Sequence, residues 1–303
     1  MSGAAYRSWG MAFALVGVMA FSFRPILIKL AYAVPAAAGH VSPVTLIFLR
    51  MVLSLPFFAA AAWWLRGQQP ALSRRDWWAV AGLGFLGYYL ASFLDFVGLQ
   101  YVSAGVGRLI LFLYPTLVLA LAFVFLRKPP ARRELAALVL SYAGIALVLS
   151  NQLGQGAGDL AVLGAVLIFT SALCYAVYLV AGSEMVKRIG SMRFTAYTMV
   201  VATAPALVQF LILEGPGALR LPAAVWLYAI IMATFSTVLP VFLQAEALKR
   251  IGPNRFALIG AIGPVTTALA GAVGLEEPFT AVQAAGAALV IGGVLLVSLR
   301  KSS

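Results

Sequence analysis

The chain has 303 residues, of which 63% are hydrophobic and 10% charged, and its mean hydropathy is +1.00. Soluble domains contain about 45–50% apolar and about 25% charged residues, so the composition excludes an ordinary water-soluble protein. The formal net charge of +12 comes from basic residues that flank apolar runs. Nucleic-acid binding is therefore not needed to explain the charge, because such binding requires one continuous basic patch.

Ten apolar runs are predicted to be membrane-spanning helices, because a helix needs about 20 mostly apolar residues to cross the bilayer core. The runs are residues 9–33, 43–65, 77–98, 103–126, 133–150, 159–182, 192–213, 222–246, 253–275 and 279–299. The first run is too long for a cleaved signal peptide and contains Arg24 and Lys29. The connections between runs are short, so we expect the protein to act within the membrane.

Basic residues concentrate in alternate connections. Sixteen of the 21 lysines and arginines lie on the side that carries both termini, whereas the opposite loops hold only Arg220. Positively charged loops stay in the cytoplasm, so we expect a multi-pass protein of a bacterial-type inner membrane with both termini cytoplasmic. All six tryptophans fall at predicted span ends, where indole rings prefer the membrane interface.

The two halves of the chain resemble each other when one is shifted by 149 residues. The shift aligns three pairs of prolines, namely Pro56 with Pro205, Pro115 with Pro264 and Pro129 with Pro278. Each half contains five spans, so the second half must begin on the other side of the membrane. We predict an all-α fold with a first repeat at residues 1–150 and a second, inverted repeat at residues 151–303.

Several short motifs carry a resemblance to a known family. They are Arg50 within residues 48–51, residues 98–105, residues 113–115 and, in the second half, residues 247–254, Gly263-Pro264, residues 275–278 and Gly292-Gly293. The chain resembles the ten-helix EamA-type branch of the drug/metabolite transporter superfamily over nearly its whole length. This resemblance implies export of amino acids or other small metabolites. Within the family, the chain looks like a bacterial exporter of aromatic or neutral amino acids. One departure is Arg127-Lys128-Pro129, where family members often carry an acidic residue.

Polar residues inside the spans are the candidates for substrate binding, because a charge at the centre of a span costs about 2.5–3.5 kcal/mol on insertion scales. Asp95 and Arg108 lie at similar depth on either side of one turn, so we expect them to pair; a structural ion pair and a substrate-binding role are both open. Arg24, Lys29 and Arg50 would attract a substrate carboxylate. For Lys29 and Arg50, the alternative is that the side chain reaches the membrane surface.

Helical spacing gathers further polar residues on single faces of the first, third, sixth and eighth spans. They either bond neighbouring helices, at about 0.6 kcal/mol each, or line a water-filled cavity, and we favour the cavity. We expect the site between spans one, three, four, six, eight and nine. The candidate substrate-binding residues are Ser22, Phe23, Arg24, Lys29, Tyr88, Tyr89, Ser92, Asp95, Arg108, Tyr114, Ser171, Tyr175, Tyr178, Thr237 and Gln244.

Motifs for catalysis, cofactors and metals are not found. The chain has one histidine, His40, and one cysteine, Cys174, and it has no Gly-Lys-Ser/Thr phosphate loop. Residues 82–87 spell G-x-G-x-x-G, but they lie inside a span without a preceding strand, which favours close helix packing. We therefore expect no enzyme activity, no cofactor and no metal.

The sequence thus predicts a secondary transporter that exports a small solute, an amino acid above all, by alternating access. The acids within spans are Asp95, which is expected to be paired, and Glu246, near an interface, so facilitated efflux is expected over proton coupling. Alternatives are a drug, nucleobase or sugar phosphate as cargo, an integral membrane enzyme acting on lipid-linked substrates, and a scaffold. The sequence does not determine the oligomeric state.

Overall fold

The computed structural model describes residues 3–36, 39–67, 71–126, 132–154, 158–277 and 279–298. The first half contains α1 (Gly3–Ser22), α2 (Arg24–Ala33), β1 (Pro35–Ala36), β2 (Gly39–His40), α3 (Pro43–Leu65), α4 (Arg74–Gly84), the π-helical turn η1 (Phe85–Leu90), α5 (Ala91–Gly98), α6 (Ala104–Leu111), α7 (Tyr114–Leu126) and α8 (Arg132–Gly154). The second half contains α9 (Gly158–Ile189), α10 (Ser191–Leu213), the 3₁₀ turn η2 (Pro216–Leu219), α11 (Ala223–Ala233), the π-helical turn η3 (Thr234–Val238), α12 (Leu239–Gly260), α13 (Ile262–Gly274) and α14 (Ala281–Ser298).

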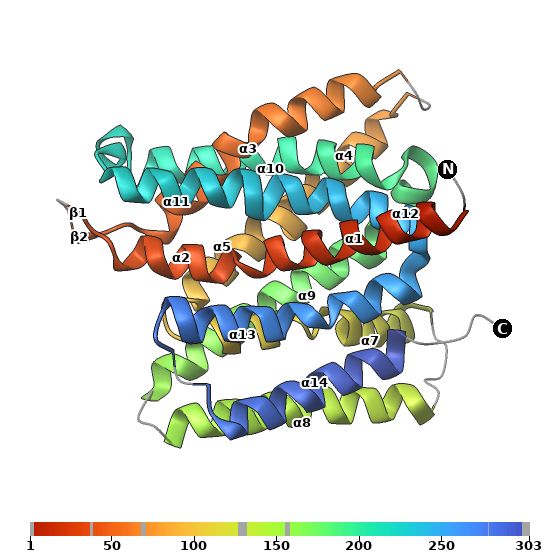
Figure 1. Ribbon diagram of the computed structural model, residues 1–303. Helices are drawn as coiled ribbons and strands as arrows, with labels where there is room; N and C mark the ends of the chain where they lie inside the picture. The colour runs from red at the N-terminus through yellow and green to blue at the C-terminus, as the bar shows by residue number, and fades with distance from the viewer. Residues whose placement is uncertain are drawn as a thin grey trace.

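The predicted membrane spans are present. Eight continuous helical segments are long and apolar enough to cross a bilayer, and two shorter apolar helices, Leu258–Gly274 and Ala281–Leu296, complete a set of ten. The fold class predicted from the sequence, an all-α membrane protein of ten helices, is confirmed. The start of α1 and the end of α14 lie at the same end of the molecule, as an even number of crossings requires (Figure 1).

Local sequence explains where the helices begin and end. Ser42 and Ser103 accept hydrogen bonds from backbone N–H groups in the first turns of α3 and α6, and Ser73 forms a reciprocal capping box with Asp76 at the start of α4. Gly190 and Gly252 have φ values of 78° and 74°, which favour glycine. Gly190 separates α9 from α10, and Gly252 makes the bend inside α12 that ends the eighth span.

The two halves share irregularities as well as helices. The turn η1 begins at Phe85 and η3 begins at Thr234, which is the 149-residue shift found in the sequence. The break between α6 and α7 includes Phe112, and the break between α12 and α13 falls at Ala261, again 149 residues later. The division at residue 150 stays a prediction, and the third proline pair of the sequence comparison, Pro129 and Pro278, lies outside the described residues.

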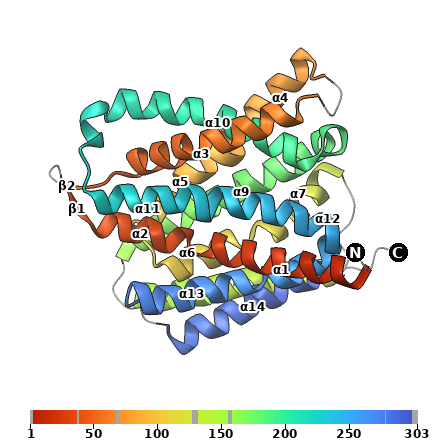
Figure 2. The ribbon, with the colours of Figure 1, turned by 45° about the horizontal axis from the view of Figure 1, so that its top comes forward.

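Helices of one half pack against helices of the other half, and the contacts come in corresponding pairs. In the repeat alignment α3 corresponds to α10 and α8 to α14, and each of these two pairs packs side by side (Figure 1, Figure 2). The contact between α1 and α12 is matched by the contact between α9 and α5. One difference is that α1 and α2 are separated by a break at Phe23, whereas the corresponding α9 is continuous.

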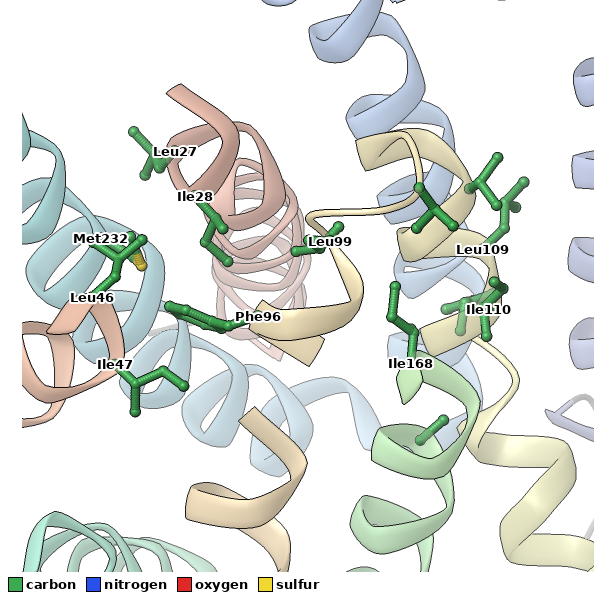
Figure 3. Packing of buried hydrophobic residues seen from close by; sticks show 14 of the residues in the cluster. Leu27, Ile28, Leu46, Ile47, Phe96, Leu99, Leu109, Ile110, Ile168 and Met232 are labelled. Carbon is green, nitrogen blue, oxygen red and sulfur yellow. The ribbon is translucent and has the colours of Figure 1, made fainter. Parts of the chain in front are cut away.

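The largest apolar cluster fills the end of the bundle near the β1–β2 hairpin. Phe96 of α5 is fully buried between α2, α3 and α11, and Leu99 extends the cluster toward α6 (Figure 3). Its neighbours in this layer are Ile28, Leu46, Ile47 and Met232. Because these side chains are mostly apolar and buried, this layer closes one end of the space between the helices.

Candidate functional site

A cavity of about 160 Å³ lies between the helices of the two halves. Its walls come from spans one, three, four, six, eight and nine, as predicted, and Arg50 of α3 adds the second span. Nine of the predicted site residues line it: Arg24, Tyr88, Ser92, Arg108, Tyr114, Ser171, Tyr175, Thr237 and Gln244.

Three arginines form the end of the cavity nearest the β1–β2 hairpin. Arg24 comes from the first turn of α2, Arg50 from α3 and Arg108 from α6, and each is at most 8% exposed. Arg24 is held there because the break at Phe23 and the proline at position 25 start a new helix at this depth. Guanidinium groups keep their proton under all physiological conditions, so this end of the cavity carries several fixed positive charges.

Asp95 pairs with Arg24, and the predicted Asp95–Arg108 pair is wrong. The distance from Arg24 Nη2 to Asp95 Oδ2 is 2.9 Å, and both side chains are buried. Among the residues that the structure describes, Arg108 forms no ion pair within 4.0 Å. The helix whose arginine contacts Asp95 is α2.

Arg50 and Arg108 are held by neutral groups and by aromatic rings. Arg50 donates a hydrogen bond of 2.8 Å to Ser92 Oγ, and its guanidinium carbon lies 5.4 Å from the centre of the Phe96 ring. The guanidinium carbon of Arg108 lies 4.5 Å from the centre of the Phe21 ring, and the same ring also faces Arg24. Arg50 is 2% exposed, so it does not reach the membrane surface, which was the alternative interpretation of its sequence position.

Tyrosines form one wall of the cavity. The rings of Tyr114 and Tyr175 meet edge to face at 5.3 Å, and Tyr175 stacks against Tyr178 at 5.8 Å. Ser171 donates a hydrogen bond to the carbonyl of Ala91, which joins α9 to α5. The wall therefore offers aromatic faces and hydroxyl groups to a bound solute.

Six predicted site residues lie outside the lining. Tyr178 packs behind the wall, and Tyr89 packs against Phe85 and Phe93. Phe23 is 36% exposed and faces Phe235. The others are Ser22, Asp95 and Lys29. Ser22 donates a hydrogen bond to the carbonyl of Val18, and Asp95 forms the ion pair with Arg24. Lys29 Nζ lies 3.5 Å from Glu277 Oε1.

The lining also contains residues that were not among the predicted site residues. Most are apolar or small, and in a sequence these are indistinguishable from residues that face a neighbouring helix or lipid; they are Val18, Phe21, Gly87, Ala91, Leu111, Phe112, Pro240, Val241, Phe256 and Gly260, together with Arg50. Arg50 carries a signal, since it is an arginine inside a span; its position predicts either attraction of a carboxylate or a side chain that reaches the membrane surface. A Cβ at Gly87 would collide with the ring of Tyr178, and one at Gly84 with the backbone of Thr198, as close packing predicts; Gly82 has nothing within 4 Å and does not fit that prediction.

Contacts across the hairpin end seal the cavity on that side. Glu277 accepts hydrogen bonds of 2.9 Å from the N–H of Ala104 at the start of α6 and faces Lys29 of α2. Tyr32 donates a hydrogen bond of 2.9 Å to the carbonyl of Phe96. The cavity extends in the other direction, along Gln244 and Phe256, which are partly exposed, toward the end that carries the start of α1.

Metal ligands do not gather in this cavity or elsewhere in the described ranges. No group of three or more histidine, cysteine, aspartate or glutamate side chains is placed to hold an ion in that part of the chain. The site instead consists of arginines, hydroxyl groups and aromatic rings around a central space.

A bundle of ten membrane helices with a cavity at the interface of two repeats is the architecture of many membrane transporters. The chain belongs to the EamA-like transporter family, whose model matches it twice, at residues 8–150 and 162–299. Two relatives in Bacillus subtilis are each 33% identical. One is the uncharacterized transporter YcbK, aligned over 95% of this chain and 91% of its own; the other is the uncharacterized transporter YyaM, aligned over 71% of each.

More distant proteins extend the same likeness. The uncharacterized transporter sll1319 of Synechocystis is 25% identical over 97% of this chain and 94% of its own. A solved crystal structure shares the fold, with a TM-score of 0.65 and 20% identity over 95% of this chain and 96% of the other.

Proposed function

We propose that this transporter moves a small organic acid across the membrane, with the carboxylate bound at Arg24, Arg50 and Arg108. The single observation that carries the proposal is the presence of three buried arginines beside one carboxylate, Asp95, at the end of the central cavity. A planar guanidinium binds a carboxylate through two parallel hydrogen bonds, so the site suits this group better than a cation or a neutral sugar.

Amino acids, the class predicted from the sequence, satisfy this requirement through their α-carboxylate. The tyrosine wall favours a solute with an apolar part, because Tyr114 and Tyr175 present ring faces as well as hydroxyl groups. Other small carboxylic acids meet the same two conditions. A sugar phosphate is the second candidate cargo, since arginine also binds phosphate bidentately.

The cavity supports transport by alternating access between two inverted repeats, residues 1–150 and 151–303. It is sealed at the hairpin end by the contacts of Glu277 and Tyr32 and extends toward the end with the chain termini. In the proposed orientation, the termini are cytoplasmic and the protein lies in the inner membrane of a bacterial-type cell. The sealed end then faces the cell exterior, and the site receives its solute from the cytoplasm, as export requires.

We propose that the solute moves down its own gradient without proton coupling, because both acidic residues of the spans form ion pairs: Asp95 with Arg24, and Glu246 with Arg250. Proton coupling needs a carboxylate that titrates during transport.

Counterflow in liposomes tests the proposal. Purified protein is reconstituted with a panel of labelled amino acids, other carboxylic acids, sugar phosphates, nucleobases and organic cations. Accumulation of carboxylates that is lost when Arg50 and Arg108 are both replaced by glutamine supports the assignment. Transport of cations or nucleobases without transport of carboxylates contradicts it, and flux that follows an imposed pH gradient contradicts facilitation.

A further inference from the structure

The charges around the cavity do not balance. Asp95 neutralises Arg24, but Arg50 and Arg108 have no carboxylate within 4.0 Å among the described residues. Both are more than nine-tenths buried, and the Nε atom of each lacks a hydrogen-bond partner. Two positive charges in the interior of a membrane protein are stable only when they are paired or solvated, so these two arginines favour a negatively charged solute in the cavity.

The arrangement of rings leaves the binding edges of the two guanidinium groups available. Phe96 covers one face of Arg50 and Phe21 covers one face of Arg108. A ring against the face of a guanidinium holds its plane while leaving in-plane N–H groups free for an oxygen acceptor. Nη2 of Arg50 donates to Ser92 Oγ at 2.8 Å and to Met51 Sδ at 3.8 Å, while its Nε has no partner among the described residues.

The rest of the lining offers no formal negative charge to a cationic group. No lining residue among those the structure describes is acidic, and Asp95 lies behind Arg24. An α-ammonium group would therefore meet only hydroxyl groups, amides and rings. This favours a solute whose charges are all negative over a zwitterion.

The cavity volume matches a small solute in this conformation. An apolar cavity of about 150 Å³ holds benzene, a frame of six carbon atoms, and the cavity here has about 160 Å³. A four- or five-carbon chain with an acid at each end is of this size, whereas an aromatic amino acid is larger.

From these observations we propose that the preferred solute is a small dianion with two acidic groups, one bound by Arg50 and the other by Arg108, as in a four- or five-carbon dicarboxylate. This inference rests on the proposed function and narrows it, because it specifies the number of anionic groups. Loading then brings the net charge around the site from two positive charges to none.

A charge ladder of equal size tests the inference. Succinate, succinamate and succinamide carry two, one and no negative charges on nearly the same frame. Each is measured for counterflow and for thermal stabilisation of the purified protein at pH 7.5. We expect succinate to bind at least about tenfold more tightly than succinamate, since each guanidinium–carboxylate contact is worth about an order of magnitude or more in affinity, and succinamide to have no effect.

Arginine variants test which side chain binds each acidic group of the solute. In Arg50→Gln and in Arg108→Gln the preference for succinate over succinamate should fall to about twofold or less, while succinamate binding changes little. Arg220→Gln removes one positive charge from an exposed connection and should keep the full preference. If a glutamine variant does not fold, Arg50→Lys and Arg108→Lys take its place in the test. Lysine keeps the positive charge, so these variants should retain part of the preference for succinate.

The outcomes separate the two proposals. Equal affinity for succinate and succinamate in the wild-type protein, with both transported, overturns the dianion inference and leaves the carboxylate function intact. If the wild-type protein transports cations and none of the carboxylates in the panel, both the dianion inference and the proposed carboxylate function are overturned.

Discussion

Replacement of Asp95 by asparagine tests whether the buried ion pair is what allows Arg24 to lie in the membrane interior. Arg24 and Asp95 are separated by 2.9 Å, with side chains 9% and 3% exposed. Removing one partner of a buried pair leaves the other charge uncompensated, which costs about 3–5 kcal/mol. We therefore expect Asp95→Asn to lower the free energy of unfolding by about this amount.

Two other ion pairs of the chain provide matched controls of increasing exposure. Asp76 pairs with Arg188 at 2.7 Å, with Arg188 half exposed, and Glu184 pairs with Lys187 at 2.6 Å on the surface. Exposed pairs contribute about 0–1 kcal/mol, so Glu184→Gln should change stability by no more than that. Asp76→Asn should fall between the other two, because Asp76 itself is buried and also caps α4.

The assay is reversible unfolding in mixed micelles, followed by circular dichroism, with each variant measured at the same lipid-to-detergent ratio. The double variant Arg24→Gln, Asp95→Asn should recover part of the loss, because it removes the unpaired charge. An Asp95→Asn protein that is as stable as Glu184→Gln would refute the reasoning, since it would mean that Arg24 is solvated or paired elsewhere.

Three further predictions follow from single contacts. Gly87→Ala should lower stability by about 1–3 kcal/mol in the same unfolding assay, because the added Cβ overlaps the ring of the buried Tyr178; unchanged stability would contradict the close approach. Glu277→Gln should lower stability by about 1 kcal/mol, since it removes the ion pair with Lys29 and a negative charge at a helix N-terminus; the same loss in Lys29→Met together with no further loss in the double variant would attribute the effect to the pair. Gln244→Cys, in a background without the native cysteine, should react with an impermeant thiol reagent in inside-out vesicles and not in right-side-out vesicles, and the opposite result would contradict the proposed orientation.

The sequence determines the spans well because one physical requirement dominates them. A bilayer core accepts only long apolar helices, so length and hydropathy locate each crossing. The prediction was least accurate at the end of the sixth span, placed at residue 182, whereas α9 continues to Ile189. Helices extend beyond the apolar core into the interface, where hydropathy no longer marks them.

The residues that line the cavity follow only partly from the sequence. Polar residues inside spans have to face the interior, and nine of the fifteen predicted residues line the cavity. The pairing of Asp95 was predicted wrongly because sequence gives the depth of a residue but not the rotation of its helix or the identity of the neighbouring one. The break before Arg24 turns that side chain toward α5, and hydropathy does not report a break of this kind.

The π-helical turns also lay outside what periodicity predicts. Patterns of polar residues were judged on the regular α-helical repeat, whereas η1 and η3 each widen one turn and shift the faces that follow. At η3 the widened turn leaves the carbonyl of Met232 to accept a hydrogen bond of 2.9 Å from Thr237 Oγ1, a residue that lines the cavity.

The matching positions of η1 and η3 bear on the history of the chain. A wide turn is uncommon in helices and tends to persist where it serves function. Two such turns at corresponding places, 149 residues apart, point to inheritance from one ancestral five-helix unit that already had the distortion before its gene was doubled. At the 149-residue shift, residues 85–89 and 234–238 share no identical residue, so the two turns have the same backbone shape without the same side chains.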